Sequence, residues 1–238
     1  MAHLRHENPK VRTSAAKILG QRQCRQAIMP LCRALQKEKK LYSKLAICEA
    51  LGALGKPSIP PLIELLGRIG NNHENTLPKK GFYKGGYPLP RDMAARTLIR
   101  IGEPALTPLL PVLDGGEPFQ MEQALDAIGH ISLYSNNSIA LPHLIGVLKT
   151  YQEHEVICWK TIRAFEAFND EQVIRILTEY LLRHPIPAYR WESARSLGII
   201  GLPSISTVLI QAQNDPHPEV QKMVQLAMGL ISLSRRSE

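Results

Sequence analysis

Residues 94–105 read AARTLIRIGEPA, and residues 15–20 carry a similar stretch, AAKILG. In both stretches a pair of alanines precedes an apolar residue at spacings of three and four, which predicts a helix with one apolar face. The small alanines allow a neighbouring helix to pack closely, and the glycine that follows indicates where the helix stops. Pro104 comes soon after, where it fits the first turn of a second helix. The stretch therefore predicts two helices joined by a short turn.

This unit recurs along the whole chain. The apolar residue that follows the alanine pair has counterparts at Leu19, Leu51, Leu98, Ile128, Phe165, Leu197 and Met228, which are 30 to 47 residues apart. Such a period is typical of helical repeat arrays, in which each unit buries its apolar face on its neighbours. We predict an all-α fold, a right-handed α-α superhelix of one helix followed by about six helix pairs. We expect a single domain over residues 1–238, with a loop insertion at about 71–89.

The composition restricts the class of protein further. Hydrophobic residues make up 44% of the chain and aromatic residues only 5%, which suits packed helices better than a β-sheet. The first residues lack a stretch of signal-peptide length, and no apolar run reaches the roughly 18 residues of a membrane span. The cysteines form no C-x-x-C pair or zinc spacing; they are Cys24, Cys32, Cys48 and Cys158. We expect a cytoplasmic protein with reduced thiols and no cofactor.

The patterns at residues 11–20 and 94–105 resemble the HEAT repeat family. The nearest variety is the short HEAT-like repeat of phycobilisome lyase subunits, which is an armadillo-like α-solenoid. The resemblance covers nearly all 238 residues, and it implies that the alanine-bearing helices line a concave face. The chain departs from the pattern in the fifth copy, where Thr161 and Ile162 replace the alanine pair, and in the long insertion after the second copy. HEAT repeats serve many functions, so the resemblance implies little about chemistry.

The repeat register identifies the residues that face outward from the alanine-bearing helices. Positions two and six residues before the recurring apolar residue lie on the face away from the core, because they are one helical turn apart. At two residues before it, the copies carry Lys17, Glu49, Arg96, Asp126, Arg163, Arg195 and Leu226. The charges alternate through the first five copies, which predicts a ladder of ion pairs between repeats. The alternation ends where two arginines follow one another.

Two tryptophans accompany these two arginines. Trp159 lies one turn before Arg163, and Trp191 lies one turn before Arg195. A tryptophan can stack on an arginine one turn away, so the two pairs predict an aromatic, cationic patch on the concave face. Tryptophan and arginine are also the residues that most often dominate binding interfaces. We predict that the four residues bind a macromolecular partner.

A structural interpretation of the same residues stays open. The rings could cover packing between repeats, while the arginines bond to Glu166 or Glu192. Both glutamates are set around the helix from the Trp and Arg positions, so the strip itself is expected to lack an acid. HEAT-like alkylpurine DNA glycosylases have a basic concave surface with tryptophan, arginine and an acidic residue. The patch is similar to theirs in composition only, and glycosylase activity stays an alternative.

Charge is distributed unevenly along the chain. Residues 1–100 hold 19 Lys and Arg against 6 Asp and Glu, whereas residues 101–238 hold 10 against 15. A basic half can attract nucleic acid, an anionic membrane or an acidic protein segment. It could also meet the acidic half of a second copy, which would give head-to-tail self-association. Incomplete cover of Ile18 and Leu19 at the start of the array fits that possibility.

The insertion at 71–89 is a loop by composition. It interleaves basic with aromatic side chains. Together with Arg91, two residues beyond its end, it supplies Lys79, Lys80, Phe82, Tyr83, Lys84 and Tyr87. Such a mixture can hold phosphates while aromatic rings stack on bases, and insertions in repeat arrays often carry binding function. The alternative is a solvated loop whose aromatic rings dock on the solenoid. We predict that these residues assist in partner binding.

Catalytic and metal-binding motifs are weak. The His-Glu dyads that HEAT-like metal hydroxylases carry on inner helices have no counterpart at the matching positions here. The H-E-x-x-H and G-x-S-x-G patterns do not occur, and no pattern indicates the chromophore pocket that a bilin lyase needs. We therefore predict a non-catalytic HEAT-repeat scaffold without a metal that binds a protein segment on its concave face. The alternative is a nucleic-acid-binding protein, including one of the alkylpurine DNA glycosylase type.

Overall fold

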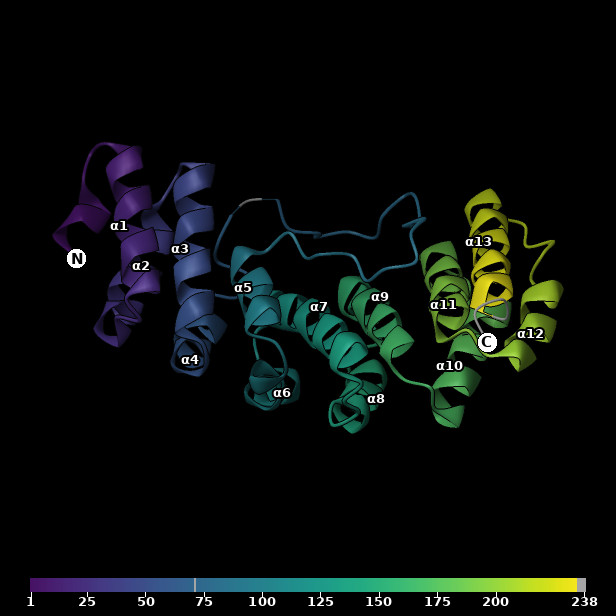
Figure 1. The fold of residues 1–238 in the computed structure, drawn as a ribbon. Helices are drawn as coiled ribbons and strands as arrows, with labels where there is room; N and C mark the ends of the chain where they lie inside the picture. Colours follow the sequence, from purple (N-terminus) through teal and green to yellow (C-terminus); the bar gives the residue numbers. More distant parts are fainter. Residues whose placement is uncertain (71, 235–238) are drawn as a thin grey trace. The chain divides into compact units, whose positions relative to one another are not determined.

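The structure is a computed structural model that describes residues 1–70 and 72–234 (Figure 1). Residue 71, at the expected start of the insertion, lies outside the described residues. Thirteen α-helices run through the described part of the chain, which contains no strand. The predicted all-α fold class is confirmed. The helices belong to two compact units, unit 1 with residues 1–73 and 90–127, and unit 2 with residues 74–89 and 128–238. The single domain expected over residues 1–238 stays a prediction.

Unit 1 begins with six short helices. They are α1 (Pro9–Gln21), α2 (Ile28–Lys37), α3 (Leu41–Leu54), α4 (Ile59–Ile63), α5 (Met93–Ile101) and α6 (Leu106–Gly115). Local residue chemistry determines where two of them start. The Asn8 side chain accepts from the backbone N–H of Lys10, and Asp92 accepts from the backbone N–H of Ala95, so both helices have a side-chain cap. Gly102 follows α5 with a φ of 80°, a conformation that favours glycine.

Unit 2 contains the later helices. They are α8 (Leu141–Thr150), α9 (Glu155–Ala164), α10 (Glu171–Arg183), α11 (Pro187–Ile200), α12 (Ser206–Gln211) and α13 (Pro218–Ser234). A longer helix, α7 (Pro118–Ser135), begins in unit 1 and ends in unit 2. Within unit 2, α11 packs against both α9 and α13, so these three helices form one layer, while α10 contacts α11 from the other side.

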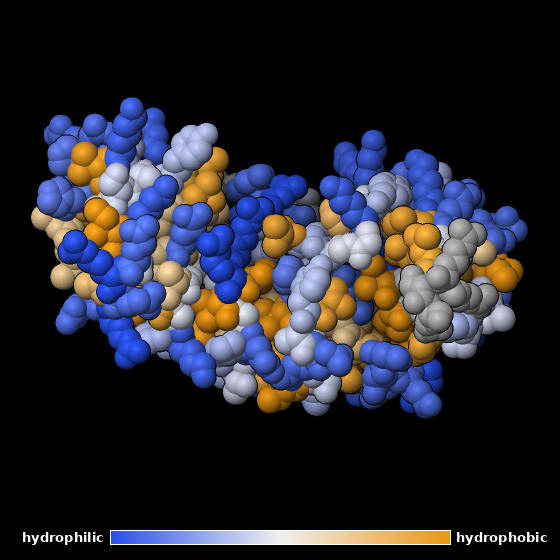
Figure 2. Space-filling model, in the orientation of Figure 1, coloured by the Kyte–Doolittle hydropathy of each residue, from blue (hydrophilic) through white to orange (hydrophobic). Residues whose placement is uncertain are grey.

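Contacts between consecutive helices give the predicted order. They pair α2 with α3, α4 with α5, α8 with α9, α10 with α11, and α12 with α13. With α6 and α7 as the remaining pair in chain order, α1 is the one helix that precedes six pairs. Among the described residues, no helix is both long and apolar enough to span a bilayer. Hydrophilic side chains predominate over α1 to α3 on the face of unit 1 drawn in Figure 2, with smaller hydrophobic groups between them.

Two glycines bring neighbouring helices into close contact rather than ending a helix. Gly20, expected at the end of its helix, lies inside α1 and is buried. A Cβ atom on Gly20 would lie 2.8 Å from the Cα of Ala50 on α3. In unit 2, a Cβ atom on Gly198 of α11 would lie 2.6 Å from the Cα of Ala227 on α13. At both positions a larger residue would push two helices apart, because the nearest atom belongs to backbone.

Candidate partner-binding site

The four residues that the sequence singles out lie together in unit 2. Trp159 and Arg163 are on α9, and Trp191 and Arg195 are on the adjacent α11. We call the surface that these four residues form the Trp/Arg face. All four are buried, with exposed fractions between 0% and 4%. The expectation that these residues form an open patch is therefore wrong, because the face is covered in this structure. Its role in binding stays a prediction.

A segment of the insertion covers the Trp/Arg face. We call residues 79–87 the cover segment; in Figure 1 it belongs to the extended trace between α4 and α5, which has no helix. Arg195 Nη2 donates to the backbone carbonyl oxygen of Gly86 at 2.8 Å, and the Arg195 guanidinium lies 5.3 Å from the centre of the Phe82 ring. Gly81 lies against Trp191, since a Cβ atom at this glycine would be 3.6 Å from Cδ1 of the indole. The insertion thus lies along its own solenoid.

Glu219, in the first turn of α13, holds the same segment. Its Oε2 accepts from the Tyr83 hydroxyl, and the backbone N–H of Gly81 also points to it, at 3.4 Å. These bonds hold the pKa of Glu219 at about 2, below its usual range, with the Tyr83 hydroxyl as the main cause. The predicted contact residue Tyr83 is therefore directed toward α13, and its own pKa is raised to about 12, chiefly by desolvation and by this carboxylate.

Two further carboxylates lie within the Trp/Arg face. Glu192 accepts from Trp159 Nε1 at 2.7 Å and from Arg195 Nη1 at 3.0 Å, and Glu166 bonds to the Arg195 guanidinium. The expectation that the strip lacks an acid is wrong, because Glu192 reaches across from α11 to α9. The spacing of three residues between Glu192 and Arg195 is a helical pairing distance that could have indicated the contact. The structural interpretation of the arginines is confirmed by these bonds.

Burial controls the protonation of Glu166. Desolvation raises the pKa of this carboxyl group to about 7, although Arg195 lowers it and Glu192 raises it further. The exposed fraction of Glu166 is only 2%. We therefore expect Glu166 to exchange its proton near neutral pH, unlike Glu219, which stays ionised.

The predicted stacking of tryptophan on arginine holds for one pair. The Arg163 guanidinium lies 4.0 Å from the centre of the Trp159 ring system, which is a cation-π contact. The second pair differs, since Arg195 lies over Phe82 and the Trp191 ring lies 6.0 Å from the His217 ring. The difference arises because the cover segment supplies Arg195 with another aromatic ring.

The charges around the Trp/Arg face are balanced. Glu74 lies 3.8 Å from Lys160 Nζ and 3.8 Å from Arg163 Nη1, and Arg163 Nη2 lies 3.5 Å from Glu192. When Glu166 is ionised, its pair with Arg195 completes a set of three cations and three carboxylates. Buried charges are tolerated only when they are paired and hydrogen-bonded. The network therefore stabilises the arrangement of α9, α11 and the start of the insertion.

Some buried donors on the Trp/Arg face have no acceptor among the described residues. They are the indole Nε1 of Trp191 and the Nε of Arg195, and the Ser193 hydroxyl is also without a partner there. Each of these residues is at most 2% exposed. Nine-tenths or more of buried polar groups in proteins are hydrogen-bonded, so these donors are unusual.

The remaining predicted residues of the insertion divide into two groups. Tyr87 is buried and packs edge-on against His130, with its ring beside Gly129 of α7. The three lysines are exposed; they are Lys79, Lys80 and Lys84. The alternative in which the aromatic rings dock on the solenoid therefore describes Tyr87 and Phe82, while the lysines face solvent.

Two other predicted residues lie in unit 1 and not on the Trp/Arg face. Arg91 is exposed, and its Nη1 donates to Asn72 Oδ1 at 3.0 Å. Arg96, one of the expected ladder residues, donates from Nε to the backbone carbonyl oxygen of Pro90 at 2.6 Å. Both arginines thus stabilise the chain where the insertion returns to α5.

Unit 1 also contains two cavities near its first helices. The larger, of about 930 Å³, is lined mainly by basic side chains; the exposed cations among them are Arg5, Arg33, Lys37, Lys39 and Lys40. Two acids, Glu7 and Glu38, also line it, and Glu38 is paired because Arg12 bonds to both of its carboxylate oxygens, at 2.6 and 2.8 Å. The cavity therefore carries an excess of positive charge.

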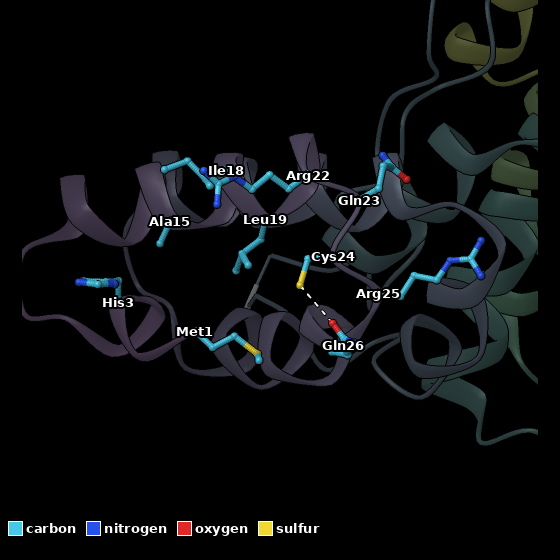
Figure 3. Close-up of a pocket in the computed structure, with 10 residues that line it drawn as sticks. All are labelled: Met1, His3, Ala15, Ile18, Leu19, Arg22, Gln23, Cys24, Arg25 and Gln26. Carbon is cyan, nitrogen blue, oxygen red and sulfur yellow. Dashed lines mark hydrogen bonds between the residues drawn. The ribbon is translucent and has the colours of Figure 1, made fainter.

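The second cavity, of about 670 Å³, is more apolar. Ala15 and Leu19 of α1 point into it, and the Cys24 thiol beside them donates to Gln26 at 3.7 Å (Figure 3). Ile18 on its rim is 47% exposed, in agreement with the incomplete cover expected at this position. Head-to-tail self-association through this end stays a prediction.

Cysteine and acidic side chains are potential metal ligands, and a cysteine thiolate is also a nucleophile. Within the described residues no group of three or more His, Cys, Asp or Glu side chains could hold a metal ion. The four cysteines are free thiols. Burial raises the pKa of Cys32, Cys48 and Cys158 to about 11, so these three are protonated and unreactive at neutral pH.

The fold and the buried face define a helical-repeat scaffold, a class whose stacked helices present long surfaces for binding. A family model for HEAT repeats matches residues 1–69 and 141–229, which is more than half of the chain. The protein belongs to the HEAT repeat family.

Comparison with solved structures gives distant similarities. A designed armadillo repeat protein shares 19% identity over 97% of both chains, with a TM-score of 0.43. An engineered protein shares 16% identity over 97% of this chain and 67% of its own, with a TM-score of 0.45. No curated protein matches the chain. None of these similarities bears on function.

Proposed function

We propose that the protein is a non-catalytic scaffold that binds an extended protein segment on the Trp/Arg face of unit 2. One observation supports this most: the face already accommodates a non-helical stretch of polypeptide, the cover segment. It does so through contacts that any polypeptide can make, because Arg195 binds a main-chain carbonyl oxygen and Glu219 accepts from a main-chain N–H. Side-chain contacts to Phe82 and Tyr83 would then supply specificity.

The chemistry of the face supports binding better than catalysis. Its carboxylates are occupied by paired arginines or by the indole of Trp159, so none is positioned to activate water. Its aromatic rings and arginines are the residue types that contribute most to binding energy. The free cysteines fit the cytoplasm, which we propose as its compartment.

Panning a display library of random 15-residue peptides against the full chain tests this function. Selected peptides are then measured by fluorescence anisotropy against wild type and Trp191→Leu. Phe119→Leu, which removes an aromatic ring from unit 1, is the matched control. We expect Trp191→Leu to weaken binding at least tenfold and Phe119→Leu to leave it unchanged. Equal weakening by both substitutions, or peptides that bind only through unit 1, would refute this location.

Nucleic-acid binding is the second candidate function. The observation in its favour is the basic cavity of unit 1, together with the exposed lysines Lys79, Lys80 and Lys84. Anisotropy with labelled single- and double-stranded DNA and RNA at two salt concentrations tests it. Binding through phosphates should fall steeply with salt and should be lost when Lys37, Lys39 and Lys40 are changed to Gln. Such a result would also justify a glycosylase assay.

A further inference from the structure

The cover segment fits the Trp/Arg face incompletely. It gives the Arg195 guanidinium one acceptor, the carbonyl oxygen of Gly86, but Arg195 Nε and Trp191 Nε1 have no acceptor among the described residues. Trp191 is 2% exposed and Arg195 is 0% exposed, so solvent does not compensate for the missing bonds. A buried donor without an acceptor is costly. The face therefore has binding capacity that its own segment does not satisfy.

The cover segment is also held weakly compared with the helices beneath it. It lacks regular secondary structure, and its residues 79, 80 and 83–86 are exposed. Three of its nine residues are glycines, Gly81, Gly85 and Gly86, which lose the most conformational freedom on ordering. Segments with few buried contacts and exposed backbone open locally without global unfolding. We expect the segment to detach while α9, α11 and α13 stay folded.

Detachment would leave the charges of the face paired. Arg195 keeps its bonds to Glu166 and Glu192, and Trp159 keeps its bond to Glu192. The opened state therefore avoids the cost of an isolated buried charge. A preformed face of this kind remains competent to bind another segment.

We propose that the cover segment is a tethered competitor for the Trp/Arg face, and that the partner is an extended polypeptide that displaces it by supplying carbonyl oxygens to Trp191 Nε1 and Arg195 Nε. This rests on the proposed function and adds to it the regulation of the site and the chemistry of its partner. The partner also places an aromatic side chain over Arg195, where Phe82 now lies. Tethering gives the cover segment a high effective concentration, so it sets a threshold for binding.

The acids of the face favour a polypeptide over a nucleic acid. Glu219 accepts from the Gly81 N–H and the Tyr83 hydroxyl, and it would need equivalent donors from any replacement. A polypeptide has such donors in its main chain, whereas a phosphodiester backbone has only acceptors and negative charge. Glu166 and Glu192 both bond to Arg195, so its guanidinium offers little uncompensated positive charge to a phosphate.

The two tryptophans provide a direct readout. The chain has only Trp159 and Trp191, so its ¹⁵N–¹H spectrum contains two indole signals. The Trp159 indole is hydrogen-bonded to Glu192, and the Trp191 indole has no acceptor. A new hydrogen bond at Trp191 should move its indole proton signal downfield. The signal therefore reports the event that the proposal requires.

The probes are synthetic peptides with the sequence of residues 78–89, PKKGFYKGGYPL, either unchanged or with Gly81→Asn or Gly81→Ala. Position 81 lies beside the Trp191 indole, and a Cβ atom there would overlap with the terminal methyl group of Met223, so this flexible side chain has to shift equally for asparagine and for alanine. An asparagine there offers an amide oxygen to Trp191, whereas alanine adds only the Cβ atom. We expect the Gly81→Asn peptide to bind at least tenfold more tightly than the Gly81→Ala peptide and to shift the Trp191 signal downfield.

Competition is tested by releasing the cover segment in the full chain. The double substitution Phe82→Ala and Tyr83→Ala removes its two side-chain anchors. The matched control is Gln152→Ala with Glu153→Ala, at exposed positions of unit 2 outside the cover segment. The released variant should bind the unchanged peptide at least tenfold more tightly than wild type, and the control should bind as wild type does. Tyr83→Phe replaces the double substitution if the latter does not fold.

The outcomes separate this proposal from the function on which it rests. Equal peptide binding by wild type and the released variant overturns the competitor role, and equal affinity of the Gly81→Asn and Gly81→Ala peptides overturns the acceptor role. No peptide binding to the released variant at millimolar concentration overturns both. Both roles would also be overturned if an oligonucleotide shifted the Trp191 signal and the peptides did not. In each case library-selected peptides that depend on Trp191 would leave the proposed function intact.

Discussion

Glu192 connects the two arginines and one tryptophan of the Trp/Arg face, and Glu192→Gln is the most informative change there. The carboxylate accepts from Trp159 Nε1 at 2.7 Å and from Arg195 Nη1 at 3.0 Å, and Arg163 Nη2 lies 3.5 Å away. Glutamine has nearly the same size but carries no charge and presents an N–H₂ group where one acceptor oxygen was. Three cations would then face only two carboxylates.

The expected loss follows from these contacts. Breaking a buried ion pair by removing one partner costs about 3–5 kcal/mol. Arg195 keeps Glu166, and the contact with Arg163 is long, so the lower end applies. We expect unit 2 to lose about 3 kcal/mol of unfolding free energy, or roughly 10 °C in melting temperature for a unit of its size. The matched control is Glu179→Gln on the exposed side of α10, which should change stability by less than about 0.5 kcal/mol.

Urea unfolding followed by tryptophan fluorescence measures this change. Both tryptophans lie in unit 2, so the signal reports that unit and not unit 1. The midpoint should fall for Glu192→Gln, while the slope stays that of wild type. A loss below about 1 kcal/mol, or the same loss in Glu179→Gln, would refute the buried charge network.

Three further outcomes are expected. Burial raises the pKa of Glu166 to about 7, so the folded state holds this proton more tightly than the unfolded state. The unfolding free energy of unit 2 should therefore fall as pH rises from about 4.5 to 7. In urea titrations, Glu166→Gln should remove this pH dependence. Arg12 is the main cause that lowers the pKa of Glu38 to about 2, and the backbone N–H groups of Lys39 and Lys40 lower it further. The contribution of Glu38 to stability should therefore be lost as pH falls from about 4.5 to 2, and Arg12→Met should weaken this dependence in unit 1, as measured by amide hydrogen exchange. Gly198→Ala should destabilise unit 2 by about 1–3 kcal/mol because its Cβ meets the α13 backbone, whereas Gly146→Ala, with open space around it, should be neutral or stabilising in thermal melts.

Helix positions could be predicted from the sequence because the residues that define a helix lie close together in the chain. The stretch at 94–105 predicts a helix that stops at its glycine, and in the structure α5 ends at Ile101, directly before Gly102. Caps and apolar spacing act over a few residues, so they can be identified without a tertiary structure. Even the order of one helix followed by six pairs follows from this local repetition.

The residues of the candidate site could also be predicted from the sequence, but their burial and hydrogen-bond partners could not. The register placed Trp159 beside Arg163, and the two form the expected cation-π contact. It placed Glu192 off the strip, because a helical wheel gives the direction of a backbone position and not the reach of a long side chain. Glu192 then crosses to the neighbouring helix and accepts from Trp159.

The sequence by itself determined a HEAT-type array, the approximate positions of its helices, and the tryptophans and arginines of its distinctive face. Only the tertiary structure decided that this face is covered, since the contacts that cover it join Gly81 to Glu219 and Gly86 to Arg195, which are 138 and 109 residues apart. A loop without periodicity gives no indication of where it will dock. Its position depends on the shape and charge of a surface that exists only after the repeats have stacked.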